Sequence, residues 1–159
     1  MKPLTDAELV HLFKRMRQYR FFYAVYVLSS LLYAASALAL SPRATPSAHT
    51  LADAALLLGL AGAAAFFAAY WTLLGPSSFK ARALEDVARA ADHAFFSMLF
   101  LLALGESLGM AALAAASFGA GSAWKLGLLC IWQVLLSALI TPERNQWDRL
   151  LSRWEKCSP

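Results

Sequence analysis

The stretch HAFFSMLFLLALGESLGMAALAAASF, residues 93–118, decides how this chain folds. It is apolar along its length except for one carboxylate, Glu106, near its middle. At ~1.5 Å per residue, a helix of this length crosses the ~30 Å hydrocarbon core of a bilayer. The stretch therefore predicts a transmembrane helix that carries an acidic side chain at mid-membrane depth.

The whole chain has the composition of a membrane protein. Of its 159 residues, 60% are hydrophobic and 15% are charged, whereas a soluble domain carries about 25% charged residues. The apolar residues form four blocks, so we expect an all-α, polytopic integral membrane protein with a single four-helix domain over residues 1–159. The expected spans are about 21–40, 51–74, 93–118 and 123–140.

A further helix is expected before the first span, over residues 5–20. Thr5 and Glu8 form a capping box, in which each residue can satisfy a free backbone N–H group of the other. Apolar residues then follow at helical spacing beside several basic ones. This pattern predicts an amphipathic helix that lies along the membrane face.

The tail predicts a second amphipathic helix, over residues 142–156. Trp147 and Trp154 share one face of this helix, and Arg149 and Arg153 lie on the rest of its surface. Tryptophan is typical of the boundary between lipid and water. We therefore expect the tail to lie in the interface, with its tryptophans directed inward and its arginines near lipid headgroups.

Basic residues are distributed unevenly along the chain. All but two of the 14 Lys and Arg residues precede the first span, follow the fourth, or lie between the second and third; the exceptions are Arg43 and Lys125. The positive-inside rule then predicts a cell inner (plasma) membrane protein with both termini in the cytoplasm. The net charge of +4 does not indicate a nucleic-acid partner, because the charges flank apolar spans and form no continuous patch.

Glu106 is the only ionisable side chain that we expect deep in the membrane. A charged carboxylate there costs several kcal/mol, so it should be protonated, hydrogen-bonded or open to water. The third and fourth spans form an antiparallel hairpin about residue 120, which places Gln133 at the height of Glu106. We expect the side chains of Glu106 and Gln133 to form a hydrogen bond, with Ser107 nearby. The group is then either a proton- or cation-binding site or a polar contact that sets the register of two helices.

Small residues form one face of the third span. Gly105 and Gly109 make a GxxxG pattern, which Ala112 and Ala116 extend. Small side chains allow another helix backbone to approach closely. This face therefore predicts a helix contact, either within the chain or with a partner.

Hydroxyl groups form a stripe along the first span. Tyr19, Tyr23, Tyr26, Ser30 and Tyr33 recur at spacings of three and four, which places them on one helix face. Hydroxyl groups within the hydrocarbon need hydrogen-bond partners, so the stripe is expected to face protein, a cavity or a bound lipid. Alternatively, Tyr19 and Tyr23 are interfacial anchors, and only the deeper members require partners.

The sequence contains no pattern that indicates catalysis or cofactor binding. It lacks a P-loop, a nucleophile elbow, a dinucleotide fingerprint and a zinc-protease motif. His11, His49 and His93 fall in separate parts of the expected topology, so we expect no metal or haem site. We therefore predict that the chain is not an enzyme and has no cofactor.

These patterns predict a non-catalytic integral membrane component, in contact with lipid and with a protein partner. It would be a subunit or assembly partner of a larger or homo-oligomeric membrane complex. The alternative is a small oligomeric proton- or cation-coupled transporter or channel that uses Glu106. A third possibility is a membrane-surface module whose basic arm and tail recruit anionic lipid.

Overall fold

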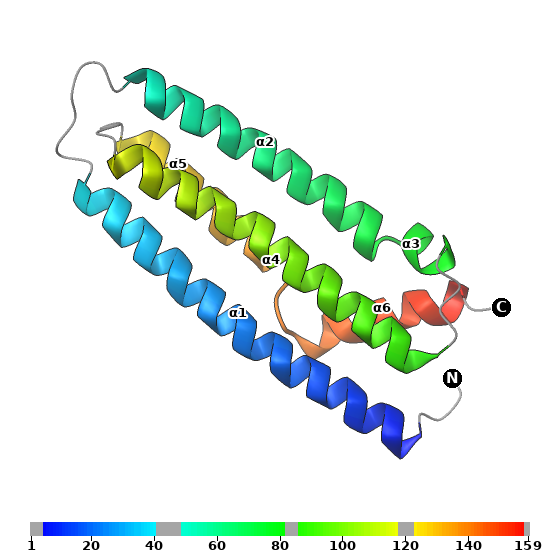
Figure 1. Ribbon diagram of the computed structural model, residues 1–159. Coiled ribbons are helices and arrows are strands. Elements are labelled where there is room, and N and C mark those ends of the chain that lie inside the picture. The colour runs from blue at the N-terminus through cyan, green and yellow to red at the C-terminus, as the bar shows by residue number, and fades with distance from the viewer. Residues whose placement is uncertain (1–4, 41–48, 82–85, 118–122, 158–159) are drawn as a thin grey trace.

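A computed structural model describes residues 5–40, 49–81, 86–117 and 123–157 (Figure 1). These ranges contain helices and no strand, which confirms the all-α prediction. The helices are α1 (Asp6–Leu40), α2 (His49–Leu74), α3 (Pro76–Ala81), α4 (Val87–Ser117), α5 (Ala123–Ala138) and α6 (Arg144–Cys157). Three of them, α1, α2 and α4, are long and apolar enough to span a membrane, whereas the apolar α5 is shorter.

The first helix differs from the prediction. Thr5 N lies 2.8 Å from Glu8 Oε2, and Glu8 N lies 3.4 Å from Thr5 Oγ1, which confirms the capping box. The helix then continues to Leu40 because no Gly or Pro interrupts it. A separate interfacial helix over residues 5–20 was therefore the wrong prediction. At ~1.5 Å per residue, α1 is ~52 Å long and exceeds the thickness of the hydrocarbon layer.

The polar segment before the third span forms two helices. The short α3 ends at Ala81, and α4 begins anew at Val87. Asp86 caps this new helix, since its Oδ1 atom accepts a hydrogen bond of 2.7 Å from the Arg89 backbone N–H group. The predicted last residue of the third span, Phe118, lies outside the described residues.

Helix α4 is the centre of the bundle. It packs against α1, α2 and α5, and Figure 1 shows α1 and α2 on either side of it, with α5 behind. Leu101 and Leu108 of α4 are almost completely buried, together with Phe66 of α2. The same view places the start of α1 and the whole of α6 at one end of the bundle, where α6 packs against α3 and α4.

Alanine side chains and an ion pair lie between the helices at the opposite end of the bundle. Ala112 and Ala116 of α4 pack in a buried cluster with Leu126 and Leu129 of α5. Asp53 near the start of α2 pairs with Lys125 at the start of α5. The small side chains let the helices approach closely, and the ion pair ties α2 to α5 beyond the apolar core.

Candidate functional site

The carboxylate of Glu106 lies beside the first helix. Tyr33 of α1 donates its hydroxyl hydrogen to Glu106 Oε1 at 3.2 Å. Both side chains are half-buried, so this pair lies at the edge of the α1–α4 contact. The carboxylate in the apolar part of α4 therefore has a hydroxyl partner that lies 73 positions away in the sequence.

Gln133 binds α1 and not Glu106. Its Nε2 atom donates to Ser30 Oγ at 2.7 Å, and Ser30 in turn donates to the Tyr26 backbone carbonyl at 2.8 Å. Gln133 is only 1% exposed. The predicted Glu106–Gln133 hydrogen bond is therefore wrong, because the hydroxyl stripe of α1 lies against both helices and supplies nearer partners.

Ser107 belongs to neither of these contacts. Its Oγ atom donates to the Leu104 carbonyl of its own helix at 2.6 Å. The residue is exposed on the outer surface of α4. Of the three predicted site residues, Glu106 and Gln133 thus bind α1, whereas Ser107 is exposed beside Gly62 of α2, with its Oγ atom 4.0 Å from the position of a Cβ atom on that glycine.

The tyrosines of α1 bind backbone carbonyl groups near the end of α5. Tyr26 donates to the Gln133 carbonyl at 3.3 Å, Tyr23 donates to the Ser137 carbonyl at 3.4 Å, and Tyr19 donates to the Ile140 carbonyl. The Ser137 carbonyl also accepts a hydrogen bond of 3.1 Å from the Ile140 backbone N–H group, and Ile140 lies just beyond the end of α5, so the three hydroxyl groups fasten α1 to the second half of α5 and to the turn after it. The stripe faces protein along its length, including Tyr19, which is fully buried.

The small-residue face of α4 receives side chains from the same chain. A Cβ atom on Gly105 would lie 2.7 Å from the Tyr26 hydroxyl oxygen. A Cβ atom on Gly109 would lie 2.4 Å from Gln133 Oε1 and 2.8 Å from Tyr33 Cδ2. Both glycines therefore make room for the polar side chains of α1 and α5. Ala112 and Ala116, which continue this face, are buried as well.

A charged cluster that the sequence did not reveal joins α1 to α4. Asp92 Oδ1 lies 2.9 Å from His11 Nε2 and accepts a hydrogen bond of 2.6 Å from Arg15 Nε. The Arg15 guanidinium group also lies 5.0 Å from the centre of the Phe95 ring. The partners are about 80 positions apart, but the uneven distribution of charge already placed both segments at the same end of the bundle.

His93 joins three elements at this end. Its Nε2 atom lies 2.9 Å from the Leu73 carbonyl oxygen of α2 and 3.1 Å from Ser78 Oγ of α3. The ring also meets Phe79 edge to face, with 5.2 Å between ring centroids. His93 is thus held among α2, α3 and α4, away from His11.

The tail helix closes the end of the bundle. Trp147 is 1% exposed and packs against Tyr19, with 6.3 Å between ring centroids. The tail was expected to lie in the interface with its tryptophans directed inward; in the structure the protein itself covers Trp147. The side chain of Trp154 lies outside the described part of the chain.

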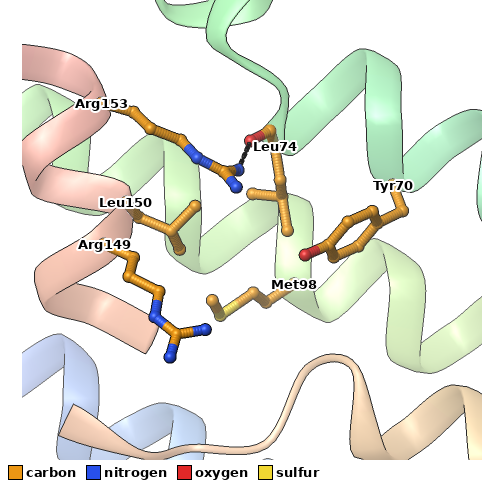
Figure 2. A pocket seen from close by; sticks show the side chains of 6 residues that line it. All are labelled: Tyr70, Leu74, Met98, Arg149, Leu150 and Arg153. Atoms are coloured by element: carbon orange, nitrogen blue, oxygen red, sulfur yellow. Dashed lines mark hydrogen bonds between the residues drawn. The ribbon is translucent and has the colours of Figure 1, made fainter. Parts of the chain in front are cut away.

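The two predicted tail arginines line a pocket. Arg153 donates from Nη1 to the Leu74 carbonyl, the last of α2, at 2.6 Å, and Arg149 is exposed. Figure 2 shows both side chains beside a cavity of about 70 Å³. This arginine pocket is lined by Tyr70, Leu74, Met98, Arg149, Leu150 and Arg153.

Within the described ranges, no three His, Cys, Asp or Glu side chains are placed to hold a metal ion. Comparison of the chain with protein-family models, with curated proteins and with solved structures finds no match.

Proposed function

We propose that this chain is a non-catalytic integral membrane component, a subunit or assembly partner of a larger or homo-oligomeric membrane complex. One observation carries the proposal: Glu106 is half-buried at the middle of the apolar part of α4, with the Tyr33 hydroxyl as its partner at 3.2 Å. A carboxylic acid that faces acyl chains is costly. A second protein that covers this surface would remove that cost.

The outer surface of α4 has the pattern of a helix-binding seam. From residue 93 onward its exposed side chains recur at alternating spacings of four and three: Phe96, Phe100, Ala103, Ser107, Met110, Ala114 and Ser117. This spacing is the one by which helices pack in left-handed pairs. Serine and alanine within this α4 stripe favour close approach of a helix. Ser107 lies at the border of the stripe with α2, since its Oγ atom is 4.0 Å from the position of a Cβ atom on Gly62.

Cysteine cross-linking in native membranes tests this proposal. The parent variant is full-length Cys130→Ser/Cys157→Ser, into which single cysteines are introduced at Ser107, Met110 or Ala114. We expect disulfide-linked dimers, or protection from a maleimide that is lost on purification, at these positions. Leu57→Cys and Leu60→Cys on the exposed surface of α2 are the matched controls. Equal labelling of both sets, together with a monomeric mass, would refute assembly through α4.

The competing function is proton- or cation-coupled transport by an oligomer. It is favoured by the half-buried Tyr33–Glu106 pair, which a proton or cation could reach from the edge of the bundle. Proteoliposomes that contain a pH-sensitive dye would report such flux. Transport requires flux in the parent protein that is lost in Glu106→Gln and kept in Ser107→Ala. Absence of flux, with normal assembly of Glu106→Gln, supports the structural role.

The proposed topology has four crossings, with both termini in the cytoplasm of a cell whose inner membrane holds the protein. The short α5 can serve as a fourth crossing because the Tyr19 hydroxyl binds the Ile140 carbonyl group just beyond its end, where the helix supplies no partner. The excess of Lys and Arg at the end that holds both termini supports the orientation. A C-terminal green fluorescent protein should then fluoresce, and a C-terminal alkaline phosphatase should be inactive. The reverse result would refute this orientation.

A further inference from the structure

The arginine pocket contains hydrogen-bond donors that are available to a ligand. Arg153 uses one of its five N–H donors on the Leu74 carbonyl, which holds the guanidinium group in place and leaves other donors free. The Arg149 guanidinium group and the Tyr70 hydroxyl make no hydrogen bond or ion pair with another side chain or backbone group in the described part of the chain, whereas the Arg149 backbone carbonyl accepts from Ser152 Oγ. Figure 2 shows the Tyr70 hydroxyl directed toward the side of the pocket from which the arginines extend.

The charge and shape of the pocket favour an oxyanion, such as a phosphate or a carboxylate. Two arginines line it, and none of its described lining residues is acidic. Arg149 and Arg153 are one helical turn apart, so they reach the same space. The planar guanidinium group matches a phosphate better than an ammonium group does, because it offers two parallel donors.

The size of the pocket limits what enters it. One water molecule needs roughly 10–15 Å³ of such space, so about 70 Å³ admits a group the size of a phosphate. A whole nucleotide does not fit. Leu74, Met98 and Leu150 supply the apolar part of the wall, which suits the first carbons of a lipid.

The depth of the pocket matches a lipid headgroup. It lies where the apolar α2 ends at Leu74 and where the polar α6 crosses the bundle. That boundary is the level at which phosphates of a bilayer lie. A ligand whose phosphate enters the pocket can leave its acyl chains along the outer surfaces of α2 and α4.

We propose that the arginine pocket binds the phosphate of an anionic phospholipid, with Arg149, Arg153 and the Tyr70 hydroxyl as donors. The bound lipid would tie α6 to the end of α2, which Arg153 already contacts. This site is independent of the α4 stripe and of the chain that covers it. Refutation of the proposed function would therefore not refute the lipid site, and the reverse also holds.

Native mass spectrometry of the full-length protein in detergent tests the site. Phosphatidylglycerol, phosphatidylcholine and inorganic phosphate serve as separate probes. We expect phosphatidylglycerol to bind more tightly than phosphatidylcholine, and Arg149→Gln to weaken that binding about fivefold. Tyr70→Phe should weaken it by a factor of about two to ten. Neither change removes a contact that holds α6 in place, so both proteins should fold.

The controls distinguish specific binding in the pocket from nonspecific attraction of an anionic lipid to positive charge. Lys14→Gln/Arg17→Gln removes two exposed charges from α1, and Arg149→Gln/Arg153→Gln removes two from the pocket. The proposal requires that Arg149→Gln/Arg153→Gln lowers the affinity for phosphatidylglycerol more than Lys14→Gln/Arg17→Gln does. An equal loss of phosphatidylglycerol affinity in the two double variants would overturn the proposal. Unchanged affinity in Arg149→Gln and Tyr70→Phe would overturn it as well. Inorganic phosphate that binds as tightly as the lipid would overturn the assignment to a phospholipid.

Discussion

Gln133 and Gly109 are fitted to each other: a Cβ atom on Gly109 would lie 2.4 Å from Gln133 Oε1. The close approach lets the Gln133 amide reach across the bundle to Ser30 of α1, at 2.7 Å. A glycine of α4 thus makes possible a polar contact between α1 and α5. The GxxxG pattern contributes to the fold of this chain through that contact.

Gly109→Ala should destabilise the protein by about 1–3 kcal/mol, because an added Cβ atom overlaps both Gln133 and Tyr33. The free energy of unfolding is measured by titration with sodium dodecyl sulfate in mixed micelles. Gly127→Ala is the matched control, since a Cβ atom there meets nothing within 4 Å. It should be neutral or stabilising by up to about 1 kcal/mol, because alanine favours helix. Equal effects of the two changes would contradict the packing described here.

Ser30→Ala and Gln133→Leu should be coupled. Each removes one side of a buried hydrogen bond, which in membranes is typically worth about 0.6–2 kcal/mol. In a double-mutant cycle, the double variant should lose less stability than the sum of the single variants. The pair Ser30→Ala and Glu106→Gln, which share no hydrogen bond, provides the comparison. Additive losses for Ser30 and Gln133 would argue against the contact.

Tyr19→Phe should cost about 1–2 kcal/mol of unfolding free energy, because it leaves the Ile140 carbonyl group without its hydroxyl partner. Hydrogen exchange should also rise at the last turn of α5. Tyr70→Phe serves as the control, since its hydroxyl makes no hydrogen bond to a described residue. Similar stabilities of the two variants would show that the Tyr19 hydroxyl is not needed for the end of α5.

Asp92→Asn should release the N-terminal part of α1 from α4 with little change in global stability. The Asp92 side chain is 36% exposed, and ion pairs of this kind contribute less than about 1 kcal/mol. Amide hydrogen exchange over residues 6–16 should therefore be faster in the variant. Arg15→Gln should have a similar effect, and the double variant should add little. Unchanged exchange in Asp92→Asn would mean that the cluster does not hold α1.

The positions of the long apolar helices could be predicted from the sequence. Length and hydrophobicity are local properties, so residues 93–118 indicate a membrane-crossing helix with Glu106 near its centre. The capping box at Thr5 is equally local, because its partners are three positions apart. The predicted boundary at residue 20 is absent, because α1 continues without a break from Asp6 to Leu40.

The partners of the polar side chains were decided by the tertiary structure. The periodicity of 3.6 residues groups Tyr26, Ser30 and Tyr33 on one face, but it does not tell which helix that face meets. The rotation and position of α1 against α4 and α5 select Tyr33 for Glu106 and Ser30 for Gln133. The burial of Trp147 likewise depends on α6 docking against the bundle. Sequence determines which groups need a partner, whereas long-range packing determines the partner that each group finds.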